Sequence, residues 1–94
     1  MCTYLTEKVG VTGSGKGAAG WFKLSEASVY FDHPVHAAAG HTLNIDFLNP
    51  GHGPSARVAV ELSAESARAL AEAIQATLAS APPELVESAT VSRA

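Results

Sequence analysis

The chain has 94 residues, of which 47% are hydrophobic, and nine acidic against six basic residues give a formal net charge of -3. A chain of this length forms one small domain, 1–94, that buries limited surface on folding, so we expect a homo-oligomer. The negative charge argues against nucleic acid as a partner, because phosphate backbones select basic surfaces. No apolar run reaches the roughly 20 residues of a spanning helix and no signal-peptide pattern opens the chain, so we expect a cytoplasmic protein with no membrane partner.

Alternation of apolar and polar residues predicts four β-strands, over about residues 2–12, 21–32, 41–48 and 56–62. The glycine-rich stretch 13–20 is typical of a loop that closes a hairpin between the first two strands. Within the second strand the apolar side chains change parity between Leu24 and Ala27. One extra residue would cause this change, so we expect a β-bulge at Ser25 and Glu26.

The C-terminal part of the chain predicts one helix, over about residues 64–80. Ser63 suits the N-cap, Glu65 suits the positive end of the helix, and apolar residues follow at helical spacing, namely Ala67, Leu70, Ala71, Ile74 and Leu78. Two prolines end the helix and leave a tail, 81–94. The predicted fold is therefore α+β, a four-stranded antiparallel meander with one C-terminal helix packed on one face.

Three of the four histidines lie within residues 33–41, from the end of the second predicted strand to the start of the third. Histidine is the commonest metal ligand, and a catalytic zinc site needs about three protein ligands and an open position for water. We therefore expect a divalent transition metal, most readily zinc, bound by His33, His36 and His41. Asp32 would orient a liganding imidazole, and Glu61 would serve as general base. The site would support hydrolase, lyase or isomerase chemistry on a small polar molecule.

The meander geometry limits which side chains can join this site. The predicted strand 41–48 separates His41 from His52 and alone spans roughly 23 Å at about 3.3 Å per residue, and Asp46 lies roughly 17 Å from His41. Neither residue can share one ion with His41 in the same chain.

Two other interpretations remain open. In the first, the protein is a non-catalytic oligomeric module that binds a ligand or partner protein, and its histidines are structural. Its binding surface would draw on the thiol and aromatic residues Cys2, Tyr4, Trp21 and Tyr30. In the second, a histidine acts with Asp32 or Glu61 in acid–base catalysis without a metal.

The single cysteine, Cys2, cannot form an internal disulfide. It is interpreted as a small apolar residue, as a soft metal ligand, or as an N-terminal nucleophile if Met1 is removed. Residues 10–17 match the GxxxxGK part of a phosphate-binding loop. We discount that motif because Gly17 replaces the required Ser or Thr and no helix pattern follows. Lys16 could still contact an anionic ligand.

Four segments also point to a family. They are MCTYLTEKV, GSGKGAAGWF, VYFDHPVHAAAGHTLNIDF and ARVAVELSAESARAL. Together they resemble a family of small, functionally uncharacterised, single-domain bacterial proteins. The resemblance implies a compact single domain and carries no activity with it.

Overall fold

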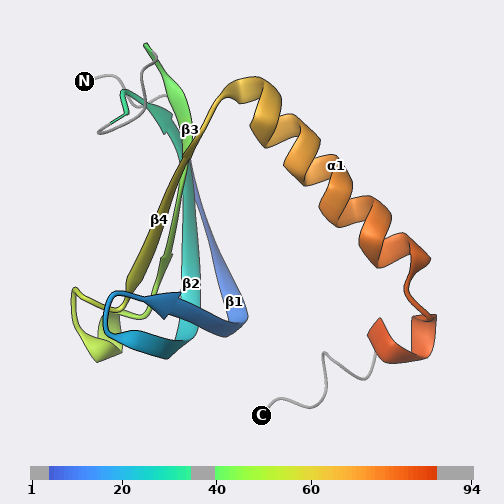
Figure 1. Ribbon diagram of the computed structural model, residues 1–94, viewed down its shortest axis with the longest axis horizontal. Helices are drawn as coiled ribbons and strands as arrows, with labels where there is room; N and C mark the ends of the chain where they lie inside the picture. Colours follow the sequence, from blue (N-terminus) through green and yellow to red (C-terminus); the bar gives the residue numbers. More distant parts are fainter. Residues whose placement is uncertain (1–4, 35–39, 87–94) are drawn as a thin grey trace. The chain divides into compact units, whose positions relative to one another are not determined.

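The computed structural model describes residues 5–34 and 40–86 (Figure 1). In chain order the elements are β1 (Thr6–Gly17), β2 (Gly20–Asp32), β3 (Thr42–Leu48), the 3-10 helix η1 (Pro50–His52), β4 (Arg57–Leu62) and α1 (Ala64–Ser80). The chain divides into two compact units, one up to Ala64 and one from Glu65 onward. The first unit holds the sheet, and the second consists of the helix and the segment after it.

The four strands form one sheet in the order β1-β2-β3-β4, and each strand is antiparallel to its neighbour. This order is the predicted meander, and the helix that follows β4 completes the predicted α+β fold. The bounds of β2, β3, β4 and α1 agree with the sequence-based ranges to within one residue. The sequence prediction was wrong about the end of β1.

The glycine-rich stretch is strand and not loop, because β1 continues to Gly17 and leaves only Ala18 and Ala19 between the two strands. Gly20 takes a positive φ of 115°, which suits glycine at this tight turn. A Cβ on Gly15 would lie 3.1 Å from Cδ2 of Leu24, and one on Gly17 would lie 3.2 Å from Cε1 of Phe22. The glycines therefore allow close packing at the end of the hairpin.

These close approaches bring the first and last strands of the sheet near each other. The Cβ position of Gly15 is 3.5 Å from Cγ2 of Val58, and that of Gly17 is 3.4 Å from the backbone oxygen of Arg57. Both of these residues belong to β4, the strand farthest from β1 in the sheet order. Figure 1 shows the end of the β1–β2 hairpin bent across the sheet.

The sheet contains a register shift, but the extra residue is on the other strand of the pair. Gly10 pairs with Glu26 and Gly13 with Leu24, so two residues of β1 face only Ser25 of β2. The predicted bulge at Ser25 and Glu26 is therefore corrected to β1 at the same level of the sheet. Gly10 and Gly13 flank the two residues that face Ser25. They favour a bulge in β1, since glycine in a strand interior commonly marks a bulge.

The register divides the sheet into an apolar and a polar face, because directly opposite residues of an antiparallel pair lie on the same face. The apolar face holds three cross-strand rows, Ala27/Phe47/Val58, Val29/Ile45/Val60 and Phe31/Leu43/Leu62. Of the apolar residues that the structure describes, only Ala27 and Ala56 are buried. The core of the sheet unit is thin, and its larger apolar side chains stay partly exposed.

The helical unit begins with α1, which has Glu65 in its first turn and the hydroxyl of Ser80 donating to the carbonyl oxygen of Ala76 at 2.8 Å. An exposed apolar stripe runs along α1 through Leu70, Ile74 and Leu78. Beyond the helix, the amides of residues 85 and 86 both donate to the carbonyl oxygen of residue 82, so the tail starts with a helical turn. Within the described part of the chain, no helix is both long and apolar enough to cross a bilayer.

Candidate functional site

The strongest candidate site is a pair of histidines at one end of the apolar face. The ladder between β2 and β3 ends with the registered partners Asp32 and Thr42. His33 and His41 occupy the next positions, so the antiparallel register places them opposite each other. Their ring centroids lie 4.4 Å apart and their planes are tilted by 33°. The structure thus brings together two of the three predicted metal ligands, and His36 lies outside the described residues.

The imidazole of His33 is held in one orientation. Its Nδ1 lies 2.8 Å from the carbonyl oxygen of Gly40. Because a carbonyl can only accept, Nδ1 is the donor of this bond, and Nε2 is the ring nitrogen left for a metal ion. Metal-ligating histidines are usually held in this way, with the second ring nitrogen donating to a carbonyl or carboxylate.

The imidazole of His41 is fixed by ring packing. It stacks on Phe31 with centroids 5.6 Å apart and an interplanar angle of 14°, and it also contacts the ring of His33. Its Nε2 atom is buried. His41 therefore combines a packing role with a ring nitrogen set inside the protein.

The pair alone does not complete a metal site. Across residues 5–34 and 40–86, no group of three or more His, Cys, Asp or Glu side chains is placed to hold an ion. Zinc usually takes four ligands. Any further ligand must therefore come from outside these ranges, from solvent or from another chain.

The two predicted catalytic carboxylates do not lie on the face of the histidine pair. Asp32 pairs with Thr42 and Glu61 pairs with Asn44, and both rows belong to the polar face. The Oδ1 atom of Asp32 accepts the backbone N–H of His33 at 2.7 Å. The Nδ1 atom of His33 is hydrogen-bonded to the Gly40 carbonyl. Glu61 lies on the opposite face of the sheet from the two imidazole rings.

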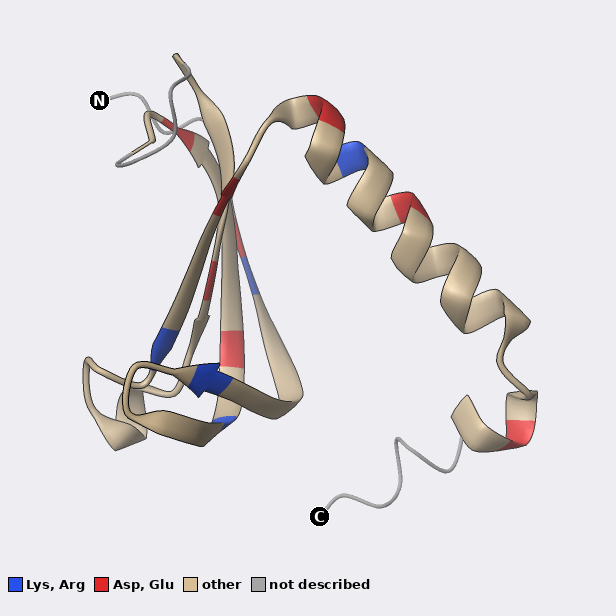
Figure 2. Cartoon of the chain, in the orientation of Figure 1, with Lys and Arg blue, Asp and Glu red and all other residues tan. Residues whose placement is uncertain are grey.

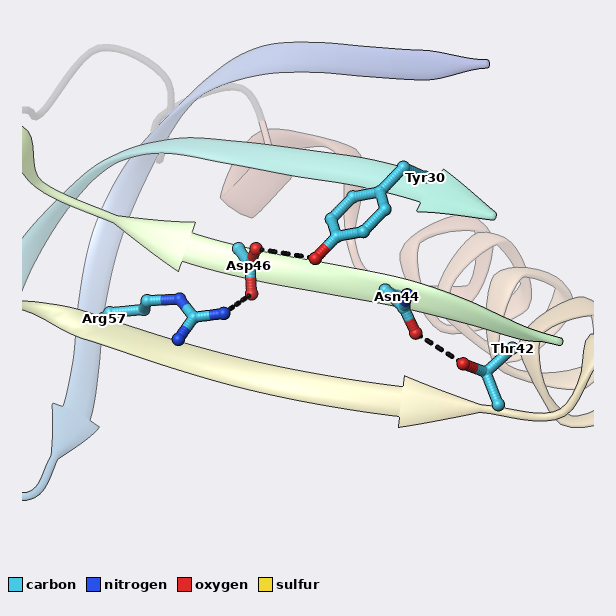
Figure 3. Close-up of polar contacts among 5 residues, drawn as sticks. All are labelled: Tyr30, Thr42, Asn44, Asp46 and Arg57. Atoms are coloured by element: carbon cyan, nitrogen blue, oxygen red, sulfur yellow. Dashed lines mark hydrogen bonds and ion pairs between the residues drawn. The ribbon is translucent and has the colours of Figure 1, made fainter. Parts of the chain in front are cut away.

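The polar face carries a three-residue network that spans β2, β3 and β4 (Figure 3). The hydroxyl of Tyr30 donates to Oδ2 of Asp46 at 3.1 Å, and a guanidinium nitrogen of Arg57 lies 2.9 Å from Oδ1 of the same carboxylate. The Asp46 side chain is 15% exposed and that of Arg57 is 49% exposed. The ion pair is thus open to solvent on its arginine side and sheltered at the carboxylate.

A second contact lies beside this network on the same face. The Thr42 hydroxyl donates to Oδ1 of Asn44 at 2.7 Å, and the two residues are only 1% and 5% exposed. Ser28 is also buried. Buried polar side chains are costly unless they form hydrogen bonds, so the Thr42–Asn44 bond explains how two of these residues are accommodated.

Burial raises the pKa of Tyr30, and the Asp46 carboxylate raises it further through its charge and its hydrogen bond, while Arg57 lowers it. The folded protein therefore holds this phenolic proton more tightly than the unfolded chain does. The resulting stabilisation is present below the ordinary pKa of 10.0 and is lost as the pH rises through the higher folded value.

We expect Tyr30→Phe to lower the free energy of unfolding at neutral pH by about 1 kcal/mol, because one hydrogen bond is lost. Above pH 10.0 the wild type should lose stability more steeply than the variant, and the two curves should converge. Urea unfolding followed across this pH range measures both effects. Parallel curves for the two proteins would show that Tyr30 does not titrate as its surroundings require.

A protein-family model described as a family of unknown function (DUF6295) matches residues 1–87. The chain belongs to this family. This match confirms the resemblance to an uncharacterised family that the sequence segments predict. No curated protein and no solved structure matches the chain. The roles of individual residues in this DUF6295 chain therefore depend on its own geometry.

Two of the four residues predicted to bind a ligand, Trp21 and Tyr30, are described in this DUF6295 chain, and they lie far apart on β2. Trp21 is 71% exposed at the hairpin end of β2, opposite Lys16. Tyr30 lies nine positions further along the same strand, roughly 30 Å away at about 3.3 Å per residue. Cys2 and Tyr4 lie outside the described residues.

Two further points follow from the strand assignments. The GxxxxGK match falls entirely within β1, which continues into an antiparallel hairpin and not into a helix, so no phosphate-binding loop forms.

The ion pair of Asp46 and Arg57 was not found from the sequence. Arg57 lies two positions before Ala59, the cross-strand partner of Asp46, so a correct register would have placed the two charges diagonally opposite.

Proposed function

We propose that the protein binds a divalent transition metal ion, most readily zinc, at the cross-strand pair His33 and His41. The supporting observation is the 4.4 Å approach of the two rings together with the 2.8 Å bond from Nδ1 of His33 to the Gly40 carbonyl. Cross-strand neighbours on one sheet face are close enough to chelate an ion at the usual zinc–nitrogen distance of about 2.0–2.1 Å.

The pair supplies two ligands, and we assign the third to His36 in the connection between β2 and β3. A fourth position then remains open for water or substrate. An ion held in this way polarises a bound oxygen or activates water, which is the chemistry of metal-dependent hydrolases, lyases and isomerases. The substrate class that fits this chemistry is a small polar molecule.

Zinc titration of metal-free protein, produced without a metal-affinity tag, tests the proposal. We expect one site per chain, and we expect His33→Ala and His41→Ala each to weaken zinc binding by at least about 100-fold, because even residues behind the ligands cost 10–100-fold. His36→Ala should also weaken binding. His52→Ala is the matched control, since His52 is exposed in η1 and lies at the opposite end of β3 from the pair.

Elemental analysis of the purified protein supplies a second readout. A zinc content below about one tenth of an ion per chain after incubation with excess zinc would contradict a specific site of ordinary affinity. Equal zinc affinities for His41→Ala and His52→Ala would exclude the pair as the ligand set.

A homo-oligomeric, non-catalytic binding module is the second candidate, and the thin core favours it. The large apolar residues that the structure leaves exposed are Leu5, Val9, Trp21, Leu70, Ile74, Leu78 and Leu85. Exposed apolar surface of this kind commonly marks a site of association. In this function the histidines pack against Phe31 and each other and bind no metal.

Light scattering measures the mass in solution. We expect a dimer or larger assembly, because association buries apolar side chains that a single chain leaves in water. A mass of 9.6 kDa, that of one chain, at every concentration measured would contradict this candidate.

A further inference from the structure

The end of the β1–β2 hairpin carries an exposed surface that the proposed metal site does not use. Trp21 lies directly opposite Lys16, and Lys23 lies opposite Ser14. Because residues two apart on a strand point to the same side, Trp21, Lys16 and Lys23 share one face of the hairpin. All three are exposed, Trp21 by 71%. We call these three residues the hairpin patch, and Figure 2 shows basic residues gathered at this end of the sheet.

The hairpin patch points away from the rest of the sheet unit. Gly15 and Gly17, the neighbours of Lys16 in the chain, lie on the other face of the hairpin. They bring that face close to Val58 and to the backbone of Arg57 in β4. Since successive side chains of a strand alternate between faces, Lys16 must lie on the outer face. The patch is therefore a free surface of the sheet unit and not part of its core.

The side chains of the hairpin change in character with distance from its tip. The turn residues Ala18 and Ala19 are small, uncharged and exposed. Lys16 and Trp21 form the next exposed pair, and Lys23 follows one exposed position further back. No acidic residue occurs from Lys8 to Ser25. An uncharged tip is thus followed by an aromatic ring paired with one lysine, and then by a second lysine.

We propose that the hairpin patch docks peripherally on an anionic lipid surface. Tryptophan prefers the headgroup region of a bilayer, where its ring is partly apolar and its N–H stays wet. Lys16 beside the ring and Lys23 behind it attract anionic headgroups while their stems cover apolar surface. This docking needs no membrane-spanning segment, so the absence of such a helix among the described residues does not bear on it.

Other partners fit the hairpin patch less well. Cores of protein–protein interfaces are depleted in lysine, yet two of the three patch residues are lysines. Single-stranded nucleic acids need several stacking aromatics along a basic groove, whereas this hairpin face presents one aromatic ring. The net charge of -3 opposes any anionic partner, but salt screens charges more than about 8 Å from the contact.

Trp21 is the only tryptophan of the chain, so its fluorescence reports directly on this surface. The full-length protein is mixed with vesicles of phosphatidylcholine alone or of phosphatidylcholine with phosphatidylglycerol. We expect a blue shift and vesicle pelleting only with the anionic lipid, and we expect added salt to reverse both. Inorganic phosphate should cause no shift, because it offers charge without an apolar boundary.

Lys16→Gln/Lys23→Gln should weaken partitioning onto anionic vesicles by about 25-fold, the effect of removing two lysines at roughly fivefold each. Trp21→Ala should weaken pelleting as well. Lys8→Gln is the control, since Lys8 is an exposed lysine of the same strand that pairs with Ser28, far from the hairpin end. Circular dichroism confirms that each variant is folded.

The assignment is overturned if anionic vesicles leave the emission of Trp21 unchanged, or if the double lysine variant pellets as the wild type does. A blue shift with an acidic peptide or an oligonucleotide and none with vesicles overturns it too. All measurements are made with and without a chelator. Docking that survives the chelator while zinc titration fails would separate this surface from the proposed metal site.

Discussion

Gly15→Val is expected to lower the free energy of unfolding by about 1–3 kcal/mol, the usual cost of forcing extra methyl groups into a packed site. The Cβ position of Gly15 is only 3.1 Å from Cδ2 of Leu24 and 3.5 Å from Cγ2 of Val58. A valine there adds two more carbon atoms next to side chains from β2 and β4. Either the hairpin end moves away from β4 or these side chains leave their preferred rotamers, and both responses cost stability.

Gly13→Val is the matched control, because it makes the same substitution two positions away on the same strand. A Cβ on Gly13 meets nothing within 4 Å. Valine is a better strand residue than glycine, so this variant should be as stable as the wild type or slightly more stable. Urea unfolding of the three proteins gives the comparison. Equal midpoints for Gly13→Val and Gly15→Val would show that β1 does not approach β4 as described.

The end of β1 shows why a sequence can indicate the fold and still misplace an element. Glycine is poor in strands and common in turns, so residues 13–20 favour a loop by local preference alone. The close approach to Val58 of β4 decides the outcome, and those residues are more than forty positions apart in the chain. Local propensity carries no information about such a contact.

The bulge illustrates a related limit. The change of apolar parity in β2 predicted an extra residue at Ser25 and Glu26, but the extra residue lies in β1 opposite Ser25. A change of parity along one strand predicts an extra residue in that same strand, whereas the structure has the extra residue in the partner strand β1. The glycines at positions 10 and 13 of β1 were the available signal, since a strand interior that contains glycine tolerates a bulge.

The sequence predicted the part of the candidate site whose position follows directly from the pairing of β2 with β3. The prediction that His33 and His41 meet at one margin of the sheet agrees with the structure, because cross-strand order follows from the strand bounds. Glu61, the predicted general base at this end of the sheet, lies on the other face. The parity of β4 places it opposite Asn44 on the polar side, and this parity was already present in the alternation of Val58, Val60 and Leu62.

Zinc should stabilise the wild-type protein strongly. At a free zinc concentration of 100 times the dissociation constant, binding to the folded state alone adds about 2.7 kcal/mol to the free energy of unfolding. For a domain of this size that corresponds to a rise in Tm of roughly 10–20 °C. Thermal unfolding with and without zinc measures this increment, and His41→Ala should abolish it, whereas His52→Ala should keep it in full.

The rise in Tm caused by zinc is more informative than the stability of any one variant, because His41 would both pack against other rings and bind the ion. Its ring stacks on Phe31 and contacts His33, so alanine removes packing and destabilises the metal-free protein whether or not zinc binds. Only the zinc-dependent part of the change in Tm reports ligation. A wild type that gains nothing from zinc, combined with a large loss in metal-free His41→Ala, would leave the histidines a packing role and favour the oligomeric module. A zinc increment that persists in His41→Ala would place the ion elsewhere on the chain.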